Sequence, residues 1–200
     1  MPKVSEEIRR GSRARLIDAA RRCAATKGFR TFTVDDVCSE AGVSKGAFYT
    51  YFDRKDDLLV AMVENDAAEY GRLMQRLRRQ GASLEQIREV VRAALRRGQD
   101  AAQVQLQADL WSEMQTNDVI RKPFAESVRE RRSRLSDLIE DTERAGELVT
   151  VPANALAAVL IALSDGLLLH RALDPSGFRW SNIGIVLDLM LDGLLKKSKP

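Results

Sequence analysis

The stretch Thr33–Lys55 reads TVDDVCSEAGVSKGAFYTYFDRK and predicts two short helices joined by a tight turn. Thr33 is a good cap for the first helix, because its hydroxyl can accept a hydrogen bond from a free backbone N–H of the first turn. Asp36 stands at the third helical position, where its carboxylate can reach back to the cap and meet the positive end of the helix dipole. Gly42 can end this helix in a left-handed conformation, and Ser44 can cap the next one.

The second predicted helix, Lys45–Phe52, divides into two sides. Phe48 and Phe52 share one side, whereas the other side chains are small, hydroxylated, aromatic or basic. This is the layout of a helix-turn-helix, whose second helix enters the major groove of DNA. Gly46 and Ala47 would let the start of the helix approach a surface closely. An ordinary helical hairpin is the alternative, but the two caps and the polar, aromatic-rich second helix favour DNA binding.

The run AGVSKGAFYTYF at residues 41–52, followed by KDDLL at residues 55–59, resembles the TetR/AcrR family of bacterial transcriptional regulators. Upstream residues fit the same pattern at Ile17–Ala20, Gly28–Phe29 and Thr33–Val34. The resemblance covers about residues 12–62, and the rest of the chain matches only in length and helical layout. Positions 47, 50 and 51 depart from the family pattern, being Ala, Thr and Tyr here. The resemblance therefore does not indicate which operator sequence the protein binds.

The resemblance implies which residues meet DNA. The start of the second helix, at Lys45, Gly46 and Ala47, would face base edges in the major groove. Thr33 and Ser44 would present their hydroxyls and the helix-start amides to phosphates.

Three further side chains match positions that touch DNA in the family. Tyr49 and Tyr51 match positions that commonly contact DNA in the family, often through phosphate, and Lys55 matches the family's phosphate-binding lysine. The complete predicted set is Thr33, Val34, Ser44, Lys45, Gly46, Ala47, Tyr49, Thr50, Tyr51 and Lys55.

The composition predicts a globular, all-α protein. The chain has 200 residues, of which 44% are hydrophobic and 30% charged, with only 5 Pro and 12 Gly. Charge is uneven, because residues 1–55 hold 12 Lys and Arg against 7 Asp and Glu, whereas the remainder holds 20 against 22. A basic first quarter suits phosphate binding by one end. The sequence contains no uninterrupted run of about eighteen apolar residues, so we predict no membrane span. No apolar signal core follows the N-terminus, and we therefore expect a cytoplasmic protein.

The sequence offers little for catalysis or metal binding. Cys23 and Cys38 lie among apolar residues of predicted helices, which favours burial over a redox pair. His170 is the only histidine, and no carboxylate pair, nucleophile set or metal cluster accompanies it. We therefore expect no catalytic residues, no metal and no cofactor, and predict that the protein is not an enzyme.

We predict two domains: a three-helix helix-turn-helix domain at residues 1–55 and a helical effector-binding and dimerisation domain at residues 56–200. Residues 1–11 are polar and basic and would form a frayed arm before a first helix at about residues 12–27. Further along, the residues from Ser83 to Gln86 match a helix capping box.

The last two predicted helices, about 152–172 and 181–197, are apolar on more than one side. A helix that is apolar nearly all round must be buried nearly all round, and a second subunit is the natural cover at the end of a small chain. We therefore predict a homodimer through a four-helix interface. The alternative is a pair of helices buried within one chain. Lysines at 196, 197 and 199 would stand near the negative end of the last helix.

The helical body is larger than a dimer clamp needs, and the resemblance implies an effector pocket between the fourth helix and the body. The candidate residues to line this pocket are Met74, Leu110, Trp111, Met114, Phe124 and His170. Ordinary core packing is the alternative for each of them. No buried charge is obvious in the sequence, which favours a small apolar or aromatic effector.

Together these observations predict a DNA-binding transcriptional regulator, most simply a repressor. It would bind double-stranded operator DNA of near-palindromic sequence as a dimer and be released by a small molecule. A non-specific architectural DNA-binding protein and a helical protein–protein adaptor are the alternatives.

Overall fold

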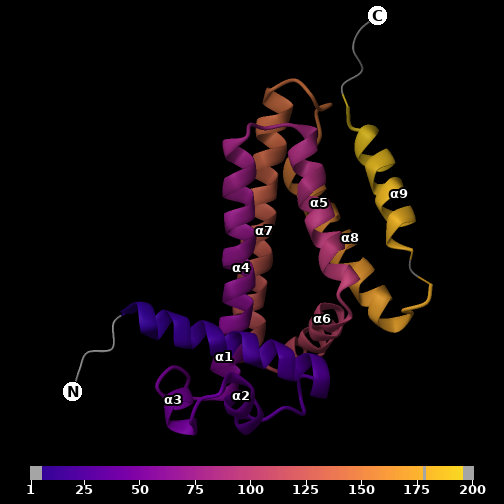
Figure 1. The fold of residues 1–200 in the computed structure, drawn as a ribbon. Helices are drawn as coiled ribbons and strands as arrows, with labels where there is room; N and C mark the ends of the chain where they lie inside the picture. Colours follow the sequence, from indigo (N-terminus) through magenta and orange to yellow (C-terminus); the bar gives the residue numbers. More distant parts are fainter. Residues whose placement is uncertain (1–5, 178, 196–200) are drawn as a thin grey trace, which may run out of the picture. The chain divides into compact units, whose positions relative to one another are not determined.

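A computed structural model describes residues 6–177 and 179–195, which form nine helices and no strand (Figure 1). The predicted all-α fold is therefore confirmed. The helices are α1 Glu6–Lys27, α2 Val34–Ala41, α3 Lys45–Tyr49, α4 Lys55–Arg79, α5 Leu84–Gln99, α6 Ala101–Met114, α7 Asp118–Arg144, α8 Ala153–Leu173 and α9 Trp180–Asp192.

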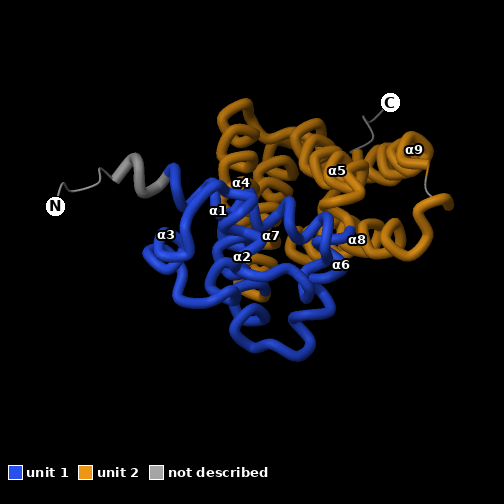
Figure 2. Tube along the Cα trace, turned by 60° about the horizontal axis from the view of Figure 1, so that its bottom comes forward, with its two compact units in different colours: residues 1–65, 105–124 blue, residues 66–104, 125–200 orange. Residues whose placement is uncertain are grey.

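The helices form two compact units that do not follow chain order (Figure 2). Unit 1 contains residues 1–65 and 105–124, and unit 2 contains residues 66–104 and 125–200. This division by packing differs from the predicted domain boundary at residue 55, because most of α6 and the start of α7 pack with the first three helices.

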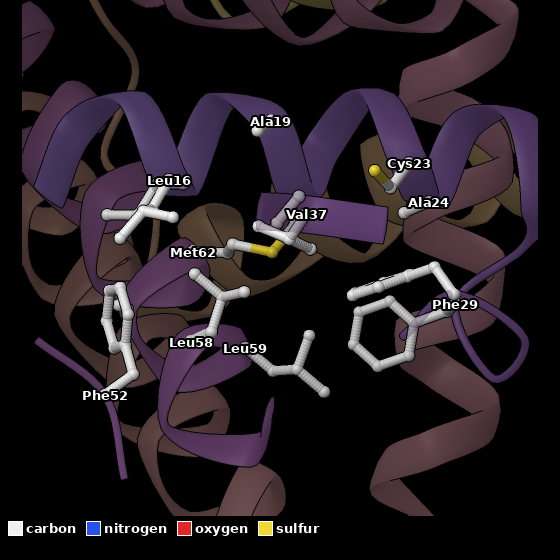
Figure 3. Packing of buried hydrophobic residues seen from close by; sticks show 14 of the residues in the cluster. Leu16, Ala19, Cys23, Ala24, Phe29, Val37, Phe52, Leu58, Leu59 and Met62 are labelled. Atoms are coloured by element: carbon white, nitrogen blue, oxygen red, sulfur yellow. The ribbon is translucent and has the colours of Figure 1, made fainter. Parts of the chain in front are cut away.

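The core of unit 1 is a single apolar cluster that brings α1, α2 and α3 together with the start of α4 (Figure 3). Phe48 is fully buried and Phe52 is 4% exposed, as the predicted inward side of the second helix requires. Cys23 and Cys38 are both buried free cysteines, as predicted. Burial of the Cys23 thiol raises its pKa, so the group stays protonated and inert at neutral pH.

Local capping fixes the helix-turn-helix as the sequence predicts. The backbone N–H of Asp36 donates to the Thr33 hydroxyl at 3.2 Å, and the Thr33 N–H donates to the Asp36 carboxylate at 2.8 Å. Gly42 ends α2 with φ at +66°, a backbone conformation that residues other than glycine rarely adopt. The Ala47 N–H donates to the Ser44 hydroxyl at 3.2 Å and starts α3.

Two boundaries differ from prediction. Helix α1 begins at Glu6 rather than near Ser12, so only residues 1–5 of the expected arm lie outside the described residues. A glycine costs only about 1 kcal/mol inside a helix, so Gly11 does not interrupt it. Helix α3 ends at Tyr49 rather than Phe52, and the N–H of Tyr51 donates to the Phe48 carbonyl, which tightens the last turn.

Asp36 makes the stability of unit 1 depend on acid pH. Hydrogen bonds from Lys27, at 2.6 Å, and from Thr33 lower the pKa of Asp36 to about 2. Because this folded-state pKa lies below the unfolded value, the stabilisation is complete above about pH 4 and is lost as pH falls towards 2. We expect the free energy of unfolding of wild-type protein to fall faster across that window than that of Asp36→Asn, as measured by urea denaturation. Parallel curves for the two proteins would contradict this assignment.

Unit 2 has its own apolar core, which includes residues of α4, α5, α7, α8 and α9. The predicted capping box at the start of α5 does not form. The Ser83 hydroxyl contacts the side chain of Gln86 and makes no cap bond, while the N–H of Leu84 donates to the Glu147 carboxylate at 2.9 Å. A carboxylate 63 residues away therefore caps this helix in place of the local one.

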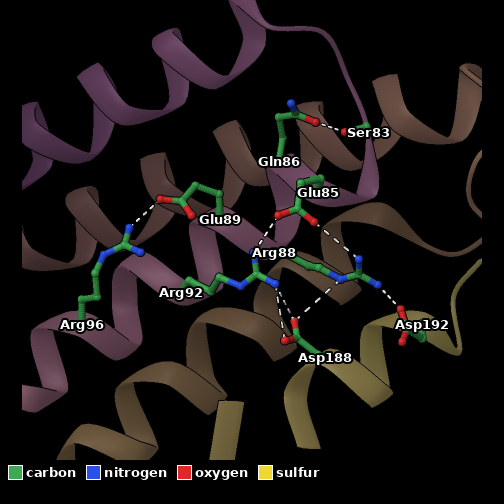
Figure 4. A network of polar contacts seen from close by, with 9 residues as sticks. All are labelled: Ser83, Glu85, Gln86, Arg88, Glu89, Arg92, Arg96, Asp188 and Asp192. Carbon is green, nitrogen blue, oxygen red and sulfur yellow. Dashed lines mark hydrogen bonds and ion pairs between the residues drawn. The ribbon is translucent and has the colours of Figure 1, made fainter. Parts of the chain in front are cut away.

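Helix α9 is attached to α5 by ion pairs along one side (Figure 4). Arg88 contacts both Asp188 and Asp192, and Arg92 bridges Asp188 at 3.4 Å and Glu85 at 2.6 Å. Next to the acidic side of α9, Leu187 and Leu191 are buried. These contacts fix the rotation of α9 about its axis and leave its remaining side outward.

Helix α8 is the single helix of the described ranges that is long and apolar enough to cross a membrane. Only 22% of its most apolar 18-residue segment is buried. The alternative of a helix pair buried within one chain is therefore wrong. Helix α9 ends at Asp192, not near residue 197, because the chain then turns so that the Val149 N–H donates to the Leu194 carbonyl at 2.9 Å. The lysines at 196, 197 and 199 lie outside the described residues.

Candidate DNA-binding site

The start of α3 forms an exposed tip. Ser44, Lys45 and Gly46 are exposed, and Ala47 is half-buried. Lys45 makes an ion pair with Asp35 of α2 at 2.7 Å, with both side chains about three-fifths exposed. An exposed pair of this kind contributes only about 0–1 kcal/mol, so Lys45 can exchange its partner for a base edge or a phosphate at little cost.

Gly46 is a glycine that the fold itself does not need. It is not among the glycines with positive φ, and a Cβ built on it would meet only the Ser44 hydroxyl, at 3.8 Å. Alanine would fit and would favour the helix by about 0.5–1 kcal/mol. The absence of a side chain here therefore leaves the start of α3 open to close approach from outside the chain.

The rest of α3 and the following turn present a mixed surface. Tyr49 is 54% exposed and packs edge-on against Phe48, with ring centroids 5.3 Å apart. Thr50 is exposed, but its hydroxyl donates to the Gly46 carbonyl at 3.0 Å. Tyr51 is half-buried against the core of unit 1. Tyr49 is therefore the better placed of the two tyrosines to reach DNA.

Thr33 and Val34 stand at the start of α2. The Thr33 hydroxyl accepts from the Asp36 N–H and donates to the Asp36 carboxylate at 3.0 Å, so the cap uses both of its functions. Val34 is half-buried against the core. By contrast, the Ser44 hydroxyl acts as an acceptor in its own cap.

Lys55 is placed differently from the expectation of a phosphate-binding lysine. It is half-buried at the start of α4, and its ammonium donates to the carbonyls of Phe32 at 2.7 Å and Phe29 at 2.8 Å. Burial lowers the pKa of Lys55 from its ordinary value. The ammonium is thus used inside unit 1, and the expected contact of Lys55 with a DNA phosphate stays a prediction.

Asp109 of α6 is a residue that sequence reasoning did not single out. Its carboxylate accepts from the Phe29 N–H at 2.8 Å and from the Gln105 side chain at 2.8 Å. The contact with Phe29 joins residues 80 positions apart, so no local pattern could have revealed it.

The six predicted effector-contacting residues do not gather in one unit. Leu110, Trp111, Met114 and Phe124 belong to unit 1, and Met74 and His170 to unit 2. Leu110 and Met74 are buried in the separate cores of these units, whereas Trp111 is 37% exposed and His170 is exposed.

The expectation of a body without buried charge is wrong. Asp165 of α8 is 8% exposed and pairs with Arg131 of α7 at 3.4 Å. The Arg131 Nε–H is buried and has no hydrogen-bond partner, and the Tyr70 hydroxyl donates to the Arg131 carbonyl at 3.4 Å. Burial raises the pKa of Tyr70 to about 12. Unit 2 therefore contains a polar group amid its apolar core.

A capped helix pair with an exposed tip of Ser44, Lys45 and Gly46 defines a helix-turn-helix DNA-binding protein. The profile described as "Bacterial regulatory proteins, tetR family" matches residues 16–62, and "BetI-type transcriptional repressor, C-terminal" matches residues 83–196. The chain belongs to the TetR family and is a DNA-binding transcriptional regulator.

Curated relatives agree with this assignment along most of their length. The HTH-type transcriptional repressor Rv1474c of Mycobacterium tuberculosis is 27% identical over 191 residues, covering 95% of this chain and 96% of that protein. The HTH-type transcriptional regulator BetI of Brucella suis is 31% identical over 176 residues, covering 86% and 85%. Relatives of this kind are transcriptional regulators.

Solved structures share the fold. A TetR transcription regulator from Haloarcula marismortui matches with a TM-score of 0.82 at 16% identity, covering 94% of this chain and 100% of that one. GusR of Salmonella enterica matches with a TM-score of 0.74 at 24% identity, covering 97% and 99%.

Proposed function

We propose that this chain is a repressor that binds a near-palindromic operator as a homodimer and is released by a small-molecule effector. The exposed tip at Ser44, Lys45 and Gly46 supports DNA reading, because it combines an exposed cation, held only by a surface ion pair, with a glycine that leaves room for close approach. The relatives Rv1474c and BetI, named as a repressor and a regulator, support control of transcription. Action on DNA implies a cytoplasmic location.

An apolar face on α8 and α9 supports the dimer. On α8 its members follow alternating steps of four and three residues: Ala155, Val159, Ala162, Gly166, Leu169 and Leu173. On α9 its members are 55–65% exposed: Ile185, Val186, Leu189 and Met190. The spacing on α8 is that of helices that pack along their length at a shallow angle. We propose that two copies of this face form a four-helix interface.

A second subunit covers this face better than lipid does. Asp165 lies on α8 and pairs with Arg131 within the same unit. Charged groups at membrane depth are costly, so a helix that carries one in its middle is poorly suited to spanning a bilayer. Two-fold symmetry would then place the two α3 tips about 34–36 Å apart, one turn of DNA, which requires a near-palindromic operator.

Operator preference tests the proposal. We expect the protein to bind DNA from its own promoter region at least about 10³-fold more tightly than random DNA of equal length at the same salt concentration, in a competition assay. Equal affinity for both DNAs would favour an architectural DNA-binding protein. No binding to either at low salt would favour a protein–protein adaptor.

The effector is proposed to bind unit 2, because the Arg131–Asp165 pair offers polar recognition beside apolar side chains. A buried Nε–H without a partner is satisfied by a ligand that brings a hydrogen-bond acceptor, so the effector would be apolar with one polar end. Met74, in the core of this unit, stays a candidate contact. The roles proposed for Leu110, Trp111, Met114, Phe124 and His170 rest on the sequence alone.

A ligand that releases DNA must bind the DNA-free state of the protein more tightly than the DNA-bound state. A ligand with equal affinity for both states does not shift the equilibrium between them. We expect at least one compound of a metabolite screen to raise the thermal midpoint of the free protein and to lower operator affinity. Operator DNA should weaken binding of that compound by the same factor. A compound that stabilises the protein without changing operator affinity would not be the effector.

A further inference from the structure

The loop between α1 and α2 is held on its carbonyl side by Lys55. The ammonium donates to Phe32 O at 2.7 Å and Phe29 O at 2.8 Å, lies 3.5 Å from Arg30 O, and stands 4.0 Å from the centre of the Phe32 ring. An ammonium has three protons to donate. Two of them are used in short bonds, and the third faces Arg30 O and the ring, so none points at an outside anion.

The same loop is held on its amide side by α6. The Phe29 N–H donates to Asp109, and the Arg30 guanidinium pairs with Glu113 at 3.2 Å. Gly28, with φ at +80°, starts the turn, and a Cβ there would stand 3.7 Å from the Asp109 carboxylate. Residues 28–32 are therefore clamped between a cation at one helix start and carboxylates on another helix.

This clamped loop leads directly into the DNA-binding helices. Phe32 is 1% exposed, and the next residue, Thr33, is the cap of α2. Helix α2 in turn fixes α3 through Gly42 and the buried Phe48. The position of the loop therefore sets where α2 begins and how the tip at Lys45 and Gly46 is presented.

We infer that Lys55 is a positioning residue for operator recognition, which clamps the 29–32 loop from within unit 1 and does not neutralise a DNA phosphate. The inference rests on DNA binding through α3, and it reverses the role that family resemblance gives to this lysine. Asp109 is its counterpart on the amide side of the loop.

Two substitutions at position 55 separate positioning from phosphate binding. Lys55→Arg keeps the charge, but a planar guanidinium cannot repeat bonds to carbonyls that an ammonium reaches from one point. Lys55→Met removes both the charge and the donors. We expect both variants to lose at least about 10-fold in operator affinity while affinity for random DNA changes less than about 3-fold, because non-specific binding depends mainly on phosphate contacts.

The salt dependence of binding gives an independent readout. A phosphate contact contributes about 0.9 to the slope of log affinity against log salt, so its loss from both subunits would lower the slope by about 1.8. We expect Lys55→Met to leave the slope unchanged. Lys45→Met, which removes an exposed cation at the tip, serves as the matched control and should lower it.

Asp109→Ala tests the clamp without removing positive charge, because alanine leaves the Phe29 N–H without its acceptor. Loss of a carboxylate from the protein would, by charge alone, favour DNA binding. We expect it instead to weaken operator binding and to speed hydrogen exchange of the Phe29 amide, which its bond to Asp109 protects. Lys55→Arg and Lys55→Met should speed exchange in residues 29–33 as well.

The inference is overturned if Lys55→Arg binds operator like wild type, or if Lys55→Met loses equal affinity for both DNAs with a slope lower by about 1.8. Unchanged operator binding by Asp109→Ala would remove the proposed counterpart and with it the clamp. Failure of wild-type protein to prefer operator would instead refute the proposed function, so the two outcomes are distinct.

Discussion

Leu189→Glu is expected to convert the dimer to monomers and to lower operator affinity by about 10²–10⁴-fold. Leu189 is 65% exposed in the single chain, on the outward side of α9, so a charged side chain there leaves the monomer fold intact. In a dimer the same position is buried against the partner, where a carboxylate without a counter-ion is costly. Binding of the second half-site is then no longer intramolecular, and the advantage of linking two sites is lost.

The measurement is sedimentation for mass and a binding titration for affinity, carried out on the same samples. Val119→Glu is the matched control, because Val119 is also an exposed apolar residue, 41% exposed, but lies at the start of α7 in unit 1. It should stay dimeric. A Leu189→Glu protein that remains a dimer, or a wild-type protein that is monomeric at all concentrations, would contradict the proposed interface.

Gly46→Glu is expected to lower operator affinity by at least about 10²-fold with little change in stability. The position is open within the protein and has ordinary backbone dihedral angles, so the fold accepts a side chain. At a surface pressed against DNA, the same side chain would occupy the space that the glycine leaves and would bring a negative charge next to phosphates. Two symmetric sites each pay this cost, at about 1.4 kcal/mol per tenfold loss.

Gly46→Ala separates helix stability from DNA binding, because its expected effects on the two have opposite signs. We expect thermal stability to rise, since alanine favours the helix by about 0.5–1 kcal/mol, while operator affinity falls. Gly11→Ala, in the open interior of α1, is the control that should raise stability without affecting DNA binding. If Gly46→Ala binds the operator as well as wild type does, this part of α3 does not approach DNA closely.

Some features of the helix-turn-helix could be predicted from the sequence and others could not. The caps of Thr33 and Ser44 and the turn at Gly42 formed as predicted, because each depends on groups within three or four residues of one another. The end of α3 and the start of α1 were displaced by several residues, because helix ends depend on small energies that neighbouring contacts change. The Ser83 side chain makes no cap bond, and the Leu84 N–H at the start of α5 donates instead to Glu147, 63 residues away in the chain.

The sequence by itself determined that the chain is helical, that residues 33–52 form a helix-turn-helix, and that the last two helices are too apolar to stand alone. Only the tertiary structure decided that Lys55 turns inward, that Asp109 holds the Phe29 amide, and that Asp165 is buried in unit 2 beside Arg131. Periodicity and caps are written within one or two helical turns, so they can be read from the chain. The partner of a charged side chain is set by which distant segment folding brings beside it, and no local pattern carries that information.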